Sequence, residues 1–326
     1  MKILVTGADG FLGSNVVREL LSRGHNVKAF IFPNSQSTTL NGLDIERYKG
    51  NLLNPDDIID AAADVDAIIH TAANTKTWPS RCKGHAAVNI DGTKNVIKAV
   101  TENNIKRLVY VGTANSFGPG TQKNPGTEKT PYASAKYGLG YMDSKYQAHL
   151  LVLDAVRQGL PAVIVNPTFM FGPHDSGPSS GAMIVAVYKG KAPGYSPGGK
   201  NYVYVKDVAV GICNALTMGH IGESYILGNE NLSYKEAFEL IARQIGAKTP
   251  KTCMPKFAVL AFGALSSGIA SITGKAPAVS YPMARISCDG HYFSPVKAVK
   301  ELQLPQTPVA DAITEAFNWF KENNKL

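Results

Sequence analysis

The first 31 residues, MKILVTGADGFLGSNVVRELLSRGHNVKAFI, constrain the fold more than any other part of the chain. Residues 3–5 form a short apolar run, as is typical of a buried parallel strand. Three glycines follow at the spacing G-x-x-G-x-x-G, and apolar residues then recur every four positions. The pattern predicts a strand, a tight glycine turn, a helix that ends at Gly24, and a second strand over 27–31.

The glycine turn predicts a dinucleotide-binding site. Glycine allows backbone conformations that a Cβ would block, and it lets a pyrophosphate approach the main chain closely. The helix that follows offers free N–H groups and a partial positive charge to the phosphates. The preceding strand and the following helix supply the context that such a motif requires. The expected cofactor-binding residues here are Gly7, Gly10, Phe11, Leu12 and Gly13.

Strands alternate with helices along most of the chain. We predict strands over 45–50, 65–71, 107–111 and 162–165, with 202–205 and 224–227 returning to the same sheet, and helices starting at residue 55 and over 89–100, 141–158, 232–245 and 309–323. This order predicts an α/β fold with a doubly wound parallel sheet of the Rossmann type. We expect residues 1–173, together with 200–228, to form the dinucleotide-binding domain. Residues 174–199 and 229–326 should form a smaller, mostly helical substrate-binding region.

In a doubly wound sheet, ligands bind at the carboxyl ends of the strands. This rule selects residues that directly follow the predicted strands. In chain order the additional cofactor-binding candidates are Phe32, Asn51, Leu52, Ala72, Ala73, Pro167 and Thr168, and Thr113 is a candidate catalytic residue.

Tyr141 and Lys145 lie four residues apart, so they share one face of the helix predicted over 141–158. A phenol normally titrates near pH ~10. A nearby ammonium group and the helix N-terminus both favour the phenolate and lower that pKa. A hydroxyl such as that of Thr113 can hold the same substrate oxygen. The three residues predict proton transfer to or from a C–O group while a nicotinamide exchanges hydride, and Tyr141 and Lys145 are also expected to contact the cofactor.

A second pair, Tyr132 and Lys136, has the same spacing. Gly138 and Gly140 follow closely and would weaken any helix that contained this pair. After Lys145, by contrast, no helix breaker occurs until Gly159. We therefore assign the catalytic role to the later pair.

Composition narrows the remaining classes of function. Hydrophobic residues make up 44% of the chain and charged residues 18%, which is ordinary for a soluble enzyme. The net charge is +8, but no dense Lys/Arg run is present, so a nucleic-acid partner is not expected. The four cysteines are scattered without metal-binding spacing, and we expect no metal. The apolar run after Lys2 is too short for a signal peptide, and we expect a cytoplasmic protein.

One apolar stretch, Phe257 to Gly274, carries no charge and lies between Lys256 and Lys275. It is at the lower edge of the length that spans a bilayer. Three glycines and four Ser/Thr residues dilute its hydrophobicity. We interpret it as a buried helix beside a substrate pocket, and contact with a membrane is the less favoured alternative.

Several motifs together resemble those of extended short-chain dehydrogenases/reductases, the NAD-dependent epimerase/dehydratase superfamily. TGADGFLG, KGNLLNP, HTAA, VNIDGTKNV, YVGTANSFG, YMDSK and VNPTFMFGPHD occur in the order seen there, and YVYVKDVA and ESYILG extend the series to about residue 228. Within the superfamily, the Asn-Pro after the sixth strand and the GPHD motif are most similar to the dihydroflavonol-4-reductase-like branch. The resemblance implies a catalytic triad of Thr113, Tyr141 and Lys145. It places Asn51 where the family usually has the Asp that touches the adenine, and it implies that the chain can form a homodimer.

Departures from the family pattern bear on the reaction. Thr113 replaces the usual Ser and keeps the hydroxyl. Ala114 and Asn115 stand where sugar 4,6-dehydratases carry acidic residues, and Asn166 stands where nucleotide-sugar epimerases tend to carry Arg. We therefore expect reversible reduction of a small-molecule ketone or aldehyde to an alcohol. An NAD-dependent nucleotide-sugar epimerase or dehydratase and a non-catalytic NAD(P)-binding sensor are the alternatives.

The cofactor choice depends on the end of the second strand. NAD-preferring relatives place an Asp there to bind the ribose hydroxyls, and NADP-preferring relatives place an Arg next to it. This chain has Ile31 and Phe32 instead, followed by a run rich in Ser and Thr. With no carboxylate at this position to repel a 2′-phosphate, the sequence favours NADP over NAD. The apolar residues of the C-terminal region favour a hydrophobic or semi-polar carbonyl substrate.

Overall fold

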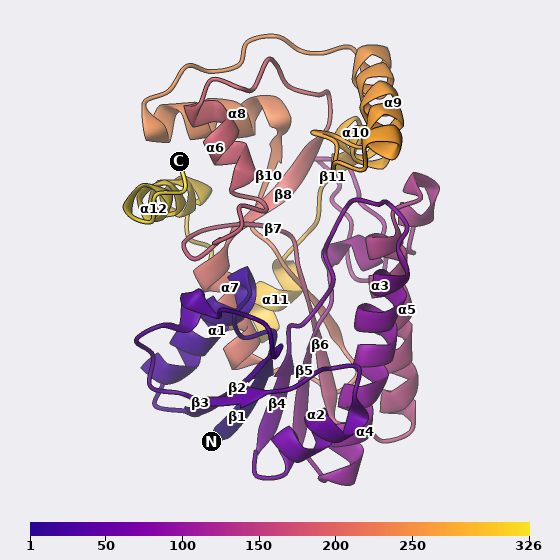
Figure 1. Ribbon diagram of the computed structural model, residues 1–326, viewed down its shortest axis with the longest axis vertical. Coiled ribbons are helices and arrows are strands. Elements are labelled where there is room, and N and C mark those ends of the chain that lie inside the picture. The colour runs from indigo at the N-terminus through magenta and orange to yellow at the C-terminus, as the bar shows by residue number, and fades with distance from the viewer.

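A seven-stranded parallel sheet forms the larger half of the molecule (Figure 1). The computed structural model describes all 326 residues. The strand order is β3-β2-β1-β4-β5-β6-β9, and every neighbouring pair is parallel. The strands are β1 (Lys2–Thr6), β2 (Asn26–Ile31), β3 (Glu46–Lys49), β4 (Ala67–His70), β5 (Arg107–Val111), β6 (Ala162–Pro167) and β9 (Ser224–Leu227). The order reverses direction between β1 and β4, which is the switch point where such sheets bind ligands.

Helices cover both faces of this sheet, which confirms the predicted doubly wound fold. One face packs against α1 (Phe11–Ser22), α7 (Val205–Asn214) and α11 (Val296–Glu301), and these helices share one buried apolar core with the strands. The other face packs against α2 (Pro55–Ala62), α4 (Gly92–Glu102) and α5 (Gly140–Arg157) in a second core. Alternate side chains of β1 enter the two cores, with Ile3 in the first and Leu4 in the second.

The helix predicted over 89–100 begins earlier than expected. A short helix, α3 (Lys83–Ala86), continues through a π-helical turn (Ala87–Asp91) into α4. The long helix predicted over 141–158 is confirmed as α5. It is followed by Gly159 at φ +100°, a backbone conformation that favours glycine.

A second, smaller sheet lies beyond the carboxyl edge of the first (Figure 1). Its strands are β7 (Phe169–Phe171), β8 (Gly199–Tyr204), β10 (Glu230–Ser233) and β11 (Gly290–His291). β8 is its central strand, parallel to β7 and β11 and antiparallel to β10. The helices α6 (Ala182–Tyr188), α8 (Tyr234–Ile245) and α12 (Val309–Glu322) share an apolar core with β7 and β8.

One strand assignment was wrong. The segment 202–205 was expected to return to the main sheet, yet its first three residues end β8 in the smaller sheet and Val205 begins α7, whereas 224–227 returns as β9. A short apolar run predicts a strand but does not specify its partner, because pairing depends on residues that are distant in sequence. The stretch 205–228 still contributes α7 and β9 to the half that contains the main sheet, and the wider division into a dinucleotide-binding and a substrate-binding region remains a prediction.

The apolar stretch 257–274 forms a helix, α9 (Lys256–Thr273), but the helix is not buried, so that expectation was also wrong. Its only buried residues are Val259, Gly263 and Ala270, which lie on one face. This face packs on α10 (Tyr281–Ser287). In Figure 1 the α9–α10 pair stands at the outer edge of the smaller region.

Candidate active site

The glycine turn after β1 packs tightly against the loop after β4. Gly7 has a φ of +66°, and a Cβ on it would lie 2.7 Å from the Cα of Ala72. A Cβ on Gly13 would lie only 2.0 Å from the carbonyl oxygen of Gly7. No larger residue fits either position without moving the backbone, so the sequence motif corresponds to a real close approach of main-chain segments.

The N-terminus of α1 has no side-chain cap. Gly10 is the residue that precedes the helix, and it offers no side-chain acceptor to the first N–H groups. Side-chain caps occur at two other α-helices, where Asn54 caps α2 and Ser233 forms a capping box with Glu236 at α8, and most of the remaining helices, such as α4, α5 and α7, also lack one. Uncapped N–H groups beside a glycine turn fit the pyrophosphate of a dinucleotide, which would complete the helix end.

Lys145 is buried beneath the carboxyl edge of the main sheet. Its ammonium group donates a hydrogen bond of 2.7 Å to the carbonyl oxygen of Val111, the last residue of β5. It also lies 4.6 Å from the ring centre of Tyr110. Burial lowers the pKa of Lys145 to about 7. The side chain therefore faces the sheet edge and not the bulk solvent.

Tyr141 lies one helical turn before Lys145, in the first turn of α5, and its phenol is near the Thr113 hydroxyl at the end of β5. Burial raises the pKa of Tyr141 above its usual value, and the neighbouring Thr113 hydroxyl opposes that shift. The sequence argument expected the Lys145 ammonium to lower this pKa. In the structure that ammonium is bonded to the Val111 carbonyl, and burial dominates.

A buried asparagine that the sequence argument did not select links this site to the loop after β4. Asn89 lies in the π-helical turn, accepts a 2.7 Å hydrogen bond from the N–H of Asn74 and donates one of 2.9 Å to the hydroxyl of Ser144. Ser144 directly precedes Lys145 on α5. Asn89 belongs to the VNIDGTKNV motif, but the motif does not indicate its partners, because they come from other segments.

The competing pair Tyr132 and Lys136 lies outside α5 and has structural partners. The Tyr132 hydroxyl donates a 2.6 Å hydrogen bond to Asp143, and its ring stacks on Tyr146. Lys136 forms an exposed ion pair with Asp289. The two residues therefore do not share a helix face. This agrees with the expectation that Gly138 and Gly140 would weaken any helix containing the pair.

The predicted adenosine contacts lie along the edge formed by β2 and β3. Asn51 follows β3, and its main-chain N–H donates to Asp57 while its side-chain oxygen accepts from the N–H of Leu53. Leu52 is buried against α4. Phe32, just past β2, is 55% exposed, so its ring is available to a ligand.

Two further predicted contacts lie at the end of β6, between the two halves of the molecule. Pro167 is the last residue of β6. The Thr168 hydroxyl donates a 2.8 Å hydrogen bond to Asn201 on β8, and its N–H bonds to Leu227 of β9. Ala73 lies in the loop after β4, beside the Ala72 that packs on the glycine turn.

The structure also identifies a carboxylate that the sequence argument overlooked. Asp9, inside the glycine turn, accepts hydrogen bonds from the hydroxyls of Ser35 and Ser37, the second at 3.3 Å. The Thr39 hydroxyl donates to the Asp9 carbonyl oxygen at 2.8 Å. The inference from Ile31 and Phe32 did not include this carboxylate, because Asp9 reaches the loop after β2 from the glycine turn.

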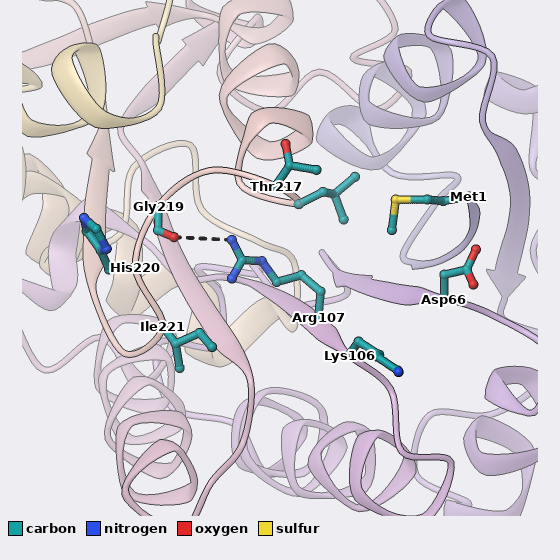
Figure 2. Close-up of a pocket in the computed structure, with 9 residues that line it drawn as sticks. Met1, Asp66, Lys106, Arg107, Thr217, Gly219, His220 and Ile221 are labelled. Atoms are coloured by element: carbon teal, nitrogen blue, oxygen red, sulfur yellow. Dashed lines mark hydrogen bonds between the residues drawn. The ribbon is translucent and has the colours of Figure 1, made fainter.

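A broad depression of about 860 Å³ lies at the opposite, amino-terminal edge of the main sheet (Figure 2). Arg107 dominates it, but its guanidinium already donates to main-chain carbonyl oxygens, at 2.9 Å to Ala215 and 3.4 Å to Gly219. Ligands of parallel sheets bind at the carboxyl edge, where none of these residues lies. We therefore assign the depression no part in the chemistry.

The fold, the glycine turn and the buried Lys145 beside Tyr141 define an enzyme class: a dinucleotide-dependent oxidoreductase built on a doubly wound sheet. Comparison with known proteins gives the family. Residues 3–228 match the model of the NAD dependent epimerase/dehydratase family, and the chain belongs to that family.

Full-length relatives are similar to the chain along its whole length. A putative dihydroflavonol 4-reductase of Synechocystis sp. is 31% identical, over 98% of this chain and 94% of its own. Sterol demethylase protein B of Methylococcus capsulatus is 29% identical, over 100% of both chains. Among solved structures, gox2253 superposes with a TM-score of 0.87 at 34% identity, covering 99% of each chain. The protein is thus an NAD(P)-dependent enzyme of the short-chain dehydrogenase/reductase type.

Proposed function

We propose that the protein reduces an apolar ketone or aldehyde to the corresponding alcohol, reversibly, with Thr113, Tyr141 and Lys145 as its catalytic residues. The observation that carries this proposal is the buried Lys145 at the carboxyl end of β5, one turn from Tyr141. A buried amine beside a phenol and a hydroxyl has little structural purpose but suits proton transfer.

Each residue has a separate task. Thr113 and Tyr141 bind the substrate oxygen, and the Tyr141 phenol donates the proton that the oxygen needs as the carbonyl is reduced. Lys145, when protonated, favours the phenolate that remains and binds the nicotinamide ribose. A nicotinamide cofactor supplies the hydride when bound. The free N–H groups at the uncapped start of α1 would bind its pyrophosphate, and the glycines of the preceding turn would allow its close approach.

The residues after Thr113 favour reduction over sugar dehydration. Ala114 is buried and Asn115 turns back to Thr113 within the same short helical turn, so no acid is available there to expel a hydroxyl group. A reductase consumes added cofactor in proportion to product. An epimerase or dehydratase would instead turn over without net consumption, which separates the two functions.

We infer that NAD(H) is the preferred cofactor, in place of the NADP that Ile31 and Phe32 suggested. The support is the Asp9 carboxylate, which lies against Ser35 and Ser37 in the loop after β2. That loop is where the adenosine ribose of a dinucleotide binds in this type of fold, and a carboxylate there repels a 2′-phosphate but accepts hydrogen bonds from ribose hydroxyls.

The apolar character of the substrate has support from the names of relatives. These include 2-alkyl-3-oxoalkanoate reductase of Stenotrophomonas maltophilia and 3-beta-hydroxysteroid dehydrogenase of Mycolicibacterium neoaurum, which are 36% and 31% identical over about half of this chain. Both names describe carbonyl or hydroxyl groups on largely apolar molecules. For this chain we propose the same general substrate class without a particular member.

The test is cofactor oxidation with a panel of ketones and aldehydes, from cyclohexanone and acetophenone to long-chain and steroid ketones. The wild-type protein should oxidise NADH with at least one of them. Tyr141→Phe should lose on the order of a hundredfold or more of kcat while retaining NADH binding, measured by fluorescence titration. Tyr132→Phe is the matched control, since it removes a phenol at the same spacing, and it should keep its turnover. Normal turnover by Tyr141→Phe would refute the assignment.

The cofactor inference has its own test. Asp9→Asn removes the negative charge but keeps the shape, and it should tighten NADPH binding relative to NADH by about tenfold, or ~1.4 kcal/mol. Fluorescence titrations with both cofactors measure this ratio. If the wild-type protein binds NADPH more tightly than NADH, the inference about Asp9 fails.

A further inference from the structure

α9 presents a broad apolar surface that no other part of the chain covers. On its outer side, Phe257, Leu265 and Ile272 are 76%, 69% and 88% exposed, and Phe262 and Ile269 are more than half exposed. These residues follow one another at helical spacing and form a continuous apolar strip. Soluble proteins rarely expose such a strip unless it binds something.

The charged residues that flank this strip in the sequence are basic, and one of them, Lys256, lies 3.8 Å from the Asp289 carboxylate. Between Glu239 and Asp289 the chain carries no acidic residue, but it carries six basic ones. They are Arg243, Lys248, Lys251, Lys256, Lys275 and Arg285. Lys256 directly begins the helix and Lys275 follows its end, and both are exposed. An apolar strip framed by exposed lysines complements an anionic lipid surface, in which the apolar side chains enter the acyl boundary and the lysines meet the headgroups.

α9 is long and apolar enough to cross a membrane by composition alone, but the fold holds it in another orientation. The hydroxyl of Ser267, in the middle of the helix, accepts a 2.8 Å hydrogen bond from the N–H of Tyr281 at the start of α10. A Cβ on Gly263 would lie 2.5 Å from the Cβ of Ala284, so α9 and α10 are in close contact. Because one face is held against the protein, the helix can lie in the membrane surface but cannot span the bilayer.

A second copy of the chain fits this surface less well than a membrane does. Pairing two copies through α9 would bring together two sets of lysines, in which Lys256 is paired with Asp289 at 3.8 Å but Lys251 and Lys275 have no carboxylate partner. An anionic bilayer supplies both the apolar phase and the missing negative charge.

We propose that α9 and its flanking lysines form a docking surface for anionic membranes, with the helix lying in the plane of the interface. The position of α10 gives this docking a use. Met283 and Ile286 of α10 belong to the same apolar cluster as Tyr141. The pair of helices α9 and α10 therefore adjoins the candidate active site. An apolar ketone dissolved in the membrane would reach the enzyme from that side. This delivery of substrate rests on the function proposed above, but the docking itself does not rest on it.

The experiment is flotation of the full-length protein with phosphatidylcholine vesicles, with and without phosphatidylglycerol. The wild-type protein should float with the anionic vesicles, and high salt should release it because screening weakens the contribution of the lysines. Leu265→Ser combined with Ile272→Ser should weaken binding at least about tenfold, since both side chains would lose their apolar contact. Lys251→Glu combined with Lys275→Glu should weaken binding to anionic vesicles in the same direction.

Matched controls lie on other faces of the protein. Ile221, 55% exposed at the opposite edge of the main sheet (Figure 2), is the apolar control, and Ile221→Ser should leave binding unchanged. Lys325→Glu near the C-terminus is the charge control. All variants should reduce a water-soluble ketone at the wild-type rate, because none of the altered residues is placed in the catalytic machinery.

Absence of wild-type flotation, or equal flotation of the Leu265/Ile272 variant, would overturn the proposal. So would a wild-type dimer in sedimentation velocity that the same variant converts to a monomer, because α9 would then be an interface between copies. Flotation without ketone reduction would leave the docking supported and the reductase function refuted. Reduction without flotation would do the reverse.

Discussion

α5 and α9 are both 18 residues long, yet they reverse the usual relation between composition and burial. α5 is rich in polar residues, and it buries Ser144, Lys145 and His149. α9 has no charged residue after Lys256, and most of its outer side chains are exposed. A buried amine and an exposed apolar strip are each unfavourable for stability alone. The comparison teaches that departures from the rule of apolar inside and polar outside mark the two places where we propose that this protein meets other molecules.

The largest expected effect concerns the buried amine of α5. Lys145→Met should lower kcat/KM by on the order of a hundredfold or more, because it removes both the charge near Tyr141 and the contact to the cofactor. Steady-state kinetics with NADH and a reducible ketone measure this. Lys136→Met is the matched control: its ion pair with Asp289 is exposed, and we expect an effect below twofold. Similar losses of kcat/KM in both variants would contradict the assignment of the catalytic role to Tyr141 and Lys145 instead of Tyr132 and Lys136.

The stability contrast between the two helices should be smaller but clear. Val152 of α5 is fully buried, and Val152→Ala should lower the free energy of unfolding by about 2 kcal/mol through lost packing and a small cavity. Ile272 of α9 is 88% exposed, and Ile272→Ala should change it by less than about 0.5 kcal/mol. Urea unfolding without vesicles provides both values. A large loss for Ile272→Ala would mean that α9 is buried in solution, against a second copy of the chain or another surface.

The pH dependence of stability gives an effect comparable in size to that of Val152→Ala. Burial lowers the pKa of Lys145 to about 7, below its ordinary value of 10.5. Between these two values the unfolded chain binds a proton that the folded protein does not, so this residue makes stability rise with pH across that window and fall as pH drops toward 7. The slope from one group is at most about 1.4 kcal/mol per pH unit. Urea unfolding of the cofactor-free protein at pH 7 and pH 9 should show the rise, and Lys145→Met should reduce it. An equal rise in stability in the variant would mean that burial does not lower the pKa of Lys145.

Much of the dinucleotide-binding half could be predicted because its signals are local. The strand, the glycine turn and the helix of 1–31 follow from residue spacing, and Gly140 and Gly159 mark the ends of α5. The selection of Lys145 over Lys136 also depended only on nearby glycines. These features are encoded by short-range backbone preferences, which a sequence displays directly.

The remaining features depend on contacts between distant segments. An apolar run such as 202–205 does not indicate which sheet it joins, and the composition of α9 does not indicate that it packs on α10 by one face and leaves the other exposed. Asp9 affects the expected cofactor choice only because the chain folds it against Ser35, twenty-six residues away. Such outcomes require the tertiary structure.

The most direct test of the account follows the hydride itself. The enzyme should be given a reducible ketone and NADH that carries deuterium at the transferable position of its nicotinamide ring, with the alcohol analysed by mass spectrometry. We predict one deuterium per alcohol formed, matched to the NADH consumed, and a loss of that product in Tyr141→Phe but not in Tyr132→Phe. Product without deuterium, or equal product from Tyr141→Phe, would contradict the account.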